Sequence, residues 1–189
     1  TNNYADHIYT LSKGISWITF QNECAAIRID DQLYKQGKGI TLYSSFKQNL
    51  KGDKIYTVFE DSEGDEWILT NKGISIIGKK QVDSDFPFQY IKEADGIIYL
   101  VSQSDKLASY NFKTRQFKFI EIPYHVSMIN EVKKFDSNTL LLATDNGLII
   151  YKIKEKEFQL IDIRTSTQPS NVVQSVYQDH YKELWIFPQ

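Results

Sequence analysis

The sequence is poor in residues that cross-link or anchor a protein. Cys24 is the only cysteine among 189 residues, which excludes an intrachain disulfide and a cysteine-based zinc site. No apolar run approaches the roughly 20 residues that a membrane-spanning helix needs. The first residues, TNNYADHIYT, lack the basic and apolar regions of a signal peptide and are typical of an internal boundary or a processed start. We therefore expect no membrane contact by this chain itself.

An excess of charge of one sign is also missing. The chain has 22 basic and 24 acidic residues, with a net charge of -2. No strongly basic face is implied, so we expect no nucleic-acid partner. Hydrophobic residues make up 41% of the chain and aromatic residues 14%, mostly Tyr and Phe. This composition indicates a folded chain and favours strands over helices.

The sequence does contain a repeat, and its register is marked by tryptophan. Trp17, Trp67 and Trp185 occupy matching positions in GISWITF, DEWILT and KELWIF. Tyr99 and Leu141 take the same position in two further segments, which gives steps of 50, 32, 42 and 44 residues. One four-stranded propeller blade spans roughly 40–45 residues. The repeat therefore indicates propeller blades.

Each repeat is predicted to be an antiparallel meander of short strands. An alternating run such as KIYTVFED leads through a polar turn to an apolar strand, then through a turn that often contains Gly to a third strand such as GISIIG. Many strands are apolar on both faces, as in a sheet covered by a neighbour on each side. The predicted fold class is all-β, a β-propeller of four-stranded antiparallel blades.

About four and a half blades are predicted. The expected units are residues 4–53, 54–84, 85–124, 125–168 and an incomplete 169–189. The first unit carries an insertion at residues 33–39, and the second lacks most of its outer strand because KQVDSD is short and polar. Such a set fits either a minimal ring or an arc of a larger propeller. The interrupted apolar strand ELWIFPQ favours the arc and a fragment of a longer protein.

The repeat resembles the two-component regulator propeller repeat. Residues 54–78 carry the resemblance best, whereas Phe20 and Asp105 depart from its pattern, standing where Thr and Gly are expected. The structural repeat positions that match are Trp17, Asp61, Gly64, Trp67, Thr70, Gly73, Thr144, Gly147, Asp179 and Trp185.

This resemblance implies a sensor role. Proteins with such repeats are typically extracytoplasmic sensor regions of hybrid two-component system histidine kinases, many of which sense oligosaccharides. It implies that the chain is a periplasmic or extracytoplasmic part of a membrane-anchored protein. It further implies an oligosaccharide ligand, the remaining blades of the parent chain as partners, no cofactor, and no catalytic residue in the chain itself.

The stretch EDSEGDEWILTNKGISII, residues 60–77, contains the densest run of acids. A calcium loop of the EF-hand type needs a different spacing, in which Gly64 would stand elsewhere and a Glu would close the loop. The alternative is a hairpin turn. In that turn Gly64 takes a positive φ, Asp61 accepts hydrogen bonds from turn N–H groups, and the other acids are solvated. The motif mismatch favours the turn.

The three tryptophans also have two interpretations, as sugar-stacking platforms or as core residues between blades. Their recurrence at one register position inside apolar strands favours the core. The three histidines, His7, His125 and His180, lack the spacing of metal ligands. The sequence also contains no phosphate-binding or nucleophile motif. Cys24 is predicted to be a small core residue, and the pairs Lys79-Lys80 and Lys133-Lys134 are predicted to be solvated.

Three functions remain open. The leading function is a glycan-sensing propeller fragment, the second is a scaffold that binds protein, and the third is a fragment of a propeller lyase or glycosidase. All three remain open because the fold alone does not choose among them. A ligand is expected at the rim loops, because binding residues concentrate on loops held by a rigid scaffold. Four tyrosines lie near such loops, Tyr34, Tyr43, Tyr124 and Tyr181, and none is assigned as a ligand contact. Uncovered blade faces predict self-association.

Overall fold

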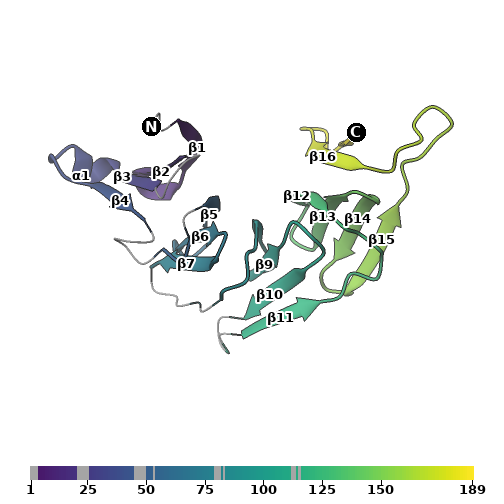
Figure 1. Cartoon of the computed structure of the whole chain (residues 1–189), viewed down its shortest axis with the longest axis horizontal. Helices are drawn as coiled ribbons and strands as arrows, with labels where there is room; N and C mark the ends of the chain where they lie inside the picture. The colour runs from purple at the N-terminus through teal and green to yellow at the C-terminus, as the bar shows by residue number, and fades with distance from the viewer. Residues whose placement is uncertain are drawn as a thin grey trace. The chain divides into compact units, whose positions relative to one another are not determined.

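The computed structural model describes residues 4–20, 26–44, 50–52, 54–78, 82, 84–111, 114 and 116–189. In these residues the chain is all-β apart from the single turns η1 (Ser12–Gly14) and α1 (Asp31–Tyr34). The chain divides into two compact units, Thr1–Gln89 and Tyr90–Gln189, which are described separately. Every paired strand is antiparallel to its neighbour in sequence, and Figure 1 shows the sheets as consecutive meanders.

The described residues of the unit Thr1–Gln89 form two sheets. The first has four strands in chain order, β1 (Ala5–Thr10), β2 (Ile15–Phe20), β3 (Ala26–Asp30) and β4 (Ile40–Tyr43). The second has three strands, β5 (Ile55–Glu60), β6 (Glu66–Thr70) and β7 (Gly73–Ile77). The expected insertion at residues 33–39 contains the end of α1 and the turn that leads into β4.

In the unit Tyr90–Gln189 the part of the chain that the structure describes forms three sheets. One has four strands, β8 (Tyr90–Ala94), β9 (Ile97–Val101), β10 (Leu107–Asn111) and β11 (Gln116–Ile120). The next also has four, β12 (Ile129–Lys134), β13 (Thr139–Thr144), β14 (Gly147–Lys152) and β15 (Glu157–Ile161). A hairpin of β16 (Val173–Gln178) and β17 (Leu184–Pro188) follows, and β12 lies beside both β8 and β16.

Strand pairing places the marker residues of the repeat at one position in each sheet. Trp17 pairs with Tyr9, Leu141 with Lys133, and Trp185 with Tyr177. Since side chains alternate between the two faces of a strand, each marker shares a face with its partner on the first strand. We call this face of each sheet the forward face and the opposite face the backward face.

The cores lie where a forward face meets the backward face of the next sheet. In the first unit Trp17 packs with Val58 and Ile68. In the second, Leu141 packs with Val173 and Val176. The four-stranded antiparallel sheets and this stacking confirm the predicted propeller-type, all-β fold. Cys24 and the pair Lys79-Lys80 lie outside the described residues.

One expectation about the tryptophans is wrong for the described structure. Trp17 and Trp67 are fully buried, as core residues should be, but Trp185 is 54% exposed. Trp185 lies on the forward face of the β16–β17 hairpin, and Tyr177 beside it is exposed as well. The forward face of this hairpin is therefore uncovered.

Candidate functional site

The acidic stretch forms a hairpin turn between β5 and β6 that is closed by Asp61. The Asp61 Oδ1 atom accepts hydrogen bonds from the backbone N–H groups of Glu63 and Asp65, each at 3.0 Å. Its Oδ2 atom accepts from the Trp67 indole at 2.8 Å. Gly64 has a φ of 85°, which glycine adopts without steric cost. Asp61 therefore fixes both the turn and the orientation of the tryptophan.

The same turn recurs between β16 and β17. Asp179 Oδ1 accepts from the N–H groups of Tyr181 and Glu183, both at 2.9 Å, and Oδ2 accepts from the Trp185 indole at 3.0 Å. The indole hydrogen bond holds the pKa of Asp179 below its usual value. Lys182 occupies the position of Gly64 with a φ of 66°, so the turn forms even where a left-handed lysine is required.

A second repeated turn uses threonine. Thr70 Oγ1 donates to the Gly73 carbonyl at 2.7 Å, and Thr144 Oγ1 donates to the Gly147 carbonyl at the same distance. Both threonines are fully buried, and both glycines have φ above 100°. In the third repeat Ser102 stands at this register position and accepts from the Lys106 N–H instead. Sequence reasoning did not identify this substitute.

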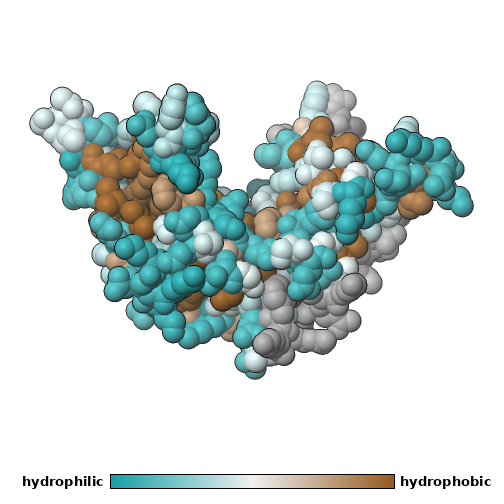
Figure 2. All heavy atoms as spheres, turned by 180° about the vertical axis from the view of Figure 1, so that it is seen from behind, coloured by the Kyte–Doolittle hydropathy of each residue, from teal (hydrophilic) through white to brown (hydrophobic). Residues whose placement is uncertain are grey.

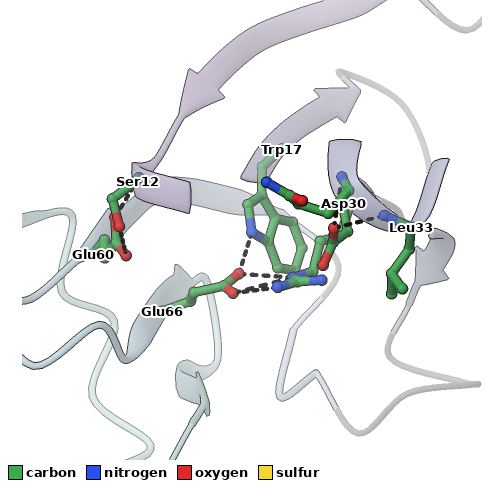
Figure 3. A network of polar contacts seen from close by, with 8 residues as sticks. Ser12, Trp17, Asp30, Leu33, Glu60 and Glu66 are labelled. Atoms are coloured by element: carbon green, nitrogen blue, oxygen red, sulfur yellow. Dashed lines mark hydrogen bonds and ion pairs between the residues drawn. The ribbon is translucent and has the colours of Figure 1, made fainter. Parts of the chain in front are cut away.

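Glu66 connects the two sheets of the first unit (Figure 3). Its side chain accepts from the Trp17 indole at 2.6 Å and forms a bidentate pair with Arg28, whose Nη2 lies 2.6 Å from Oε1. The carboxylate side chain is 8% exposed and the guanidinium side chain 19% exposed. The hydrogen bond to Glu66 raises the pKa of Arg28 above its usual value.

Glu60 makes a second link between these sheets. Its carboxylate accepts from the Ser12 backbone N–H and hydroxyl, each at 2.6 Å. The expectation that every acid of this stretch except Asp61 is solvated is therefore wrong: Asp65 and Glu66 are buried, and Glu60 is hydrogen-bonded. Glu60 and Glu66 therefore both bind donors of the neighbouring sheet, and the Glu66 carboxylate satisfies the buried Trp17 indole N–H.

In the second unit, polar side chains of the first strands bind the backbone of the next sheet. Tyr90 of β8 donates to the Asn130 carbonyl at 2.7 Å. Lys133 of β12 donates to the Val176 carbonyl at 2.7 Å, and Glu131 accepts from the Val176 N–H at 2.8 Å. Lys133 was expected to be solvated, and it is instead anchored on β16. Burial lowers the pKa of the nearby Lys92, while Glu131 opposes this effect.

The tyrosines near the rim differ in their surroundings. Tyr43 packs on Trp17 with ring centroids 4.9 Å apart, and Tyr124 donates to the Phe158 carbonyl at 3.1 Å. Tyr34 is 58% exposed at the end of α1. Tyr181 is 75% exposed in the Asp179 turn, beside the ring of His180.

The carboxylates of the acidic stretch accept hydrogen bonds from the protein itself. Asp61 and Glu66 each direct both of their carboxylate oxygens to protein donors, Asp61 within its turn and Glu66 between the two sheets. His7 pairs with Asp6 at 3.3 Å, whereas His125 and His180 belong to the other unit. Within the described ranges, no cluster of three or more metal-ligating side chains occurs. No helix among the described residues is long and apolar enough to span a membrane.

No protein-family model matches the chain, and no curated protein matches its sequence. Solved structures do match. The extracellular domain of a B. thetaiotaomicron protein described as a one component system has a TM-score of 0.72 and 19% identity over 98% of this chain, which spans 26% of that domain. The extracellular domain of a second protein from that organism, described as a hybrid two component system, has a TM-score of 0.69 and 20% identity, with 96% and 25% covered.

Enzymes share the fold as well. Virginiamycin B lyase from Staphylococcus aureus has a TM-score of 0.70 and 18% identity, and the match covers 95% of this chain and 61% of the lyase. The chain thus spans about a quarter of the length of the bacterial extracellular domains that it resembles. Identities this low show the fold alone. The chain has the propeller fold found in extracellular domains of one- and two-component systems and in a lyase.

Proposed function

We propose that this chain is part of the extracytoplasmic sensor region of a two-component system, that it binds an oligosaccharide and that it contributes to signal transduction without catalysis. The observation that supports this proposal best is the structural similarity to two bacterial extracellular domains over nearly the whole chain. The use of the acidic stretch in blade junctions agrees with a non-enzymatic role.

Tyr181 is the proposed point of contact with the sugar. Tyr181 is 75% exposed and its ring lies beside that of His180, while its backbone N–H donates to Asp179, so the aromatic side chain is carried on a hydrogen-bonded turn. Aromatic rings of this kind bind the apolar faces of ligands while their hydroxyl remains in water. Tyr34 is the matched control because it is similarly exposed and lies in the other unit.

A glycan screen tests this proposal. The 189-residue chain is presented to a panel of oligosaccharides, and hits are measured by isothermal titration calorimetry. We expect at least one oligosaccharide class to bind, Tyr181→Ala to weaken binding at least tenfold, and Tyr34→Ala to leave it unchanged. Absence of binding by the chain would contradict the glycan ligand, and an equal loss in both variants would contradict the assignment of Tyr181.

A lyase is the second candidate, because the chain covers 61% of virginiamycin B lyase with a TM-score of 0.70. Incubation with virginiamycin B, followed by mass spectrometry, separates the two functions. The sensor proposal predicts no product at any pH. Turnover above the buffer rate would replace it with an enzymatic function.

A further inference from the structure

One position of the repeat changes from an aromatic residue to lysine in the second unit. The residue that pairs with the marker is aromatic on the first strand of three sheets and lysine on that of two others: Tyr9, Phe59, Tyr177, Lys92 and Lys133. Lys92 belongs to β8 and Lys133 to β12, and these two strands lie side by side within one unit. Both lysines lie on the forward faces of their sheets.

Lys133 shows how the protein satisfies a lysine at this position. Its ammonium group donates to the Val176 carbonyl at 2.7 Å and lies 3.6 Å from a carboxylate oxygen of Glu131. It also lies 5.7 Å from the centroid of the Tyr177 ring. A carbonyl, a carboxylate and an aromatic face therefore replace the water that the Lys133 ammonium loses between the sheets.

Lys92 occupies the same position without such partners. Hydrophilic residues cover much of the surface seen in Figure 2, where water satisfies a lysine, but the Lys92 side chain is partly buried. Among the described residues, no hydrogen bond or ion pair reaches its ammonium group. Tyr90, on the same face of β8, takes the Asn130 carbonyl of β12 at 2.7 Å. Lys92 is thus a partly buried cation that the described protein groups leave unpaired.

The Lys92 ammonium remains within reach of a ligand. In the described part of the chain, no fully buried side-chain nitrogen or oxygen lacks a hydrogen bond, so Lys92 Nζ, which has none, keeps contact with solvent. Burial has the largest effect on the pKa of Lys92 and lowers it, whereas Glu131 raises it and Lys133 lowers it. Because Glu131 pairs with Lys133, their charges cancel and the positive charge of Lys92 is left without compensation.

We propose that Lys92 is an anion-binding residue, which forms an ion pair with the carboxylate of a small ligand where β8 meets β12. A singly charged group fits this place best, since it balances one positive charge, whereas a dianion such as phosphate would also be repelled more strongly by Glu131. The other titratable neighbour is Tyr99 of β9, which pairs with Lys92 across the strands. This site does not depend on the sugar contact proposed at Tyr181.

Glucuronate and glucose are the probes, because they differ at one carbon, which is a carboxylate in the first and a hydroxymethyl group in the second. The chain is labelled with carbon-13 in its lysines, and the Cε signals are followed by NMR against pH. Lys92→Met assigns the Lys92 signal, and Lys92→Arg assigns it if the first variant is unfolded by circular dichroism. Glucuronate should raise the pKa of Lys92 by about one unit, which corresponds to tenfold tighter binding to the charged amine, and glucose should not.

Lys154 is the control, because its side chain is 59% exposed and lies 3.9 Å from Asp95 in the same unit. Lys92→Met should abolish glucuronate binding, Lys92→Arg should preserve it, and Lys154→Met should leave it unchanged. An unmoved Lys92 signal, an equal response to glucose, or equal shifts at Lys92 and Lys154 would overturn the proposal. Tighter binding of inorganic phosphate than of glucuronate would overturn the assignment of a singly charged carboxylate.

Discussion

Glu66→Gln is the most informative single change in the first unit. The Glu66 side chain is 8% exposed and accepts hydrogen bonds from the Trp17 indole and from Nε and Nη2 of Arg28. The substitution replaces the carboxylate with an amide that has one acceptor oxygen and no charge to pair with Arg28. Hydrogen bonds to charged groups contribute about 1.5–3 kcal/mol each. Removing one partner of a buried ion pair costs about 3–5 kcal/mol. Because Gln keeps some of these bonds and Arg28 is partly solvated, we expect a loss of about 2–3 kcal/mol.

Urea unfolding measures this loss through the fluorescence of the buried tryptophans Trp17 and Trp67. With an m-value of about 2 kcal/mol/M, the midpoint should fall by on the order of 1 M. Glu63→Gln is the control, since Glu63 is an exposed acid of the same stretch. It should change the free energy of unfolding by less than about 0.5 kcal/mol.

The double variant Glu66→Leu with Arg28→Met separates pairing from packing. If the cost of Glu66→Gln comes from an unpaired Arg28, removing both charges should recover much of it, because apolar replacement of a whole buried pair is often neutral. An unchanged midpoint in Glu66→Gln would refute the view that this carboxylate holds the two sheets together. A double variant as unstable as the sum of its single changes would refute the pairing argument.

Three further outcomes are expected. Trp67→Ala should lower the free energy of unfolding in urea by about 3–5 kcal/mol, because it opens a cavity at a fully buried position. Trp185→Ala, at a half-exposed position, should lower it by less than about 1 kcal/mol, and equal losses would contradict the burial argument. Gly73→Ala should destabilise the chain strongly in thermal melts, because its φ is 127° and the new Cβ would lie 2.0 Å from the Ser84 carbonyl oxygen. At Gly96 a Cβ would meet no atom within 4 Å, so Gly96→Ala should lower the free energy of unfolding by only about 1 kcal/mol. Burial raises the pKa of Tyr99 to about 12 from 10.0. The folded state therefore favours the neutral phenol, and the stability that this contributes is complete below pH 10 and is lost as the pH rises toward 12. Denaturation measured across this range, with tyrosinate absorbance to follow ionisation, would contradict the prediction if the stability did not fall.

Local features of the fold could be predicted from the sequence because their hydrogen bonds join residues a few positions apart. The Asp61 turn involves residues two to six positions away, and the Thr70 turn spans three. Residue type and spacing are enough to specify such turns. The alternation of each strand and the recurrence of its marker residue then predicted antiparallel sheets of propeller type, which the structure confirms.

The roles of the acids could not be predicted in this way. Glu66 meets Arg28 and Trp17, which are 38 and 49 residues away, only because the second sheet stacks on the first. Lys133 likewise binds the Val176 carbonyl 43 residues further on. A charged residue in an isolated strand looks solvated, and only the facing sheet shows which donors it satisfies.

By itself, the sequence determined the repeat, the strand order within each blade and the turns that Asp61 and Asp179 close. The tertiary structure alone decided which faces are covered. Trp17 and Trp185 occupy the same register position, yet one is fully buried and the other is 54% exposed. The physical reason is that burial of a sheet face depends on the partner that lies against it, and the residues of that face do not encode the partner's presence.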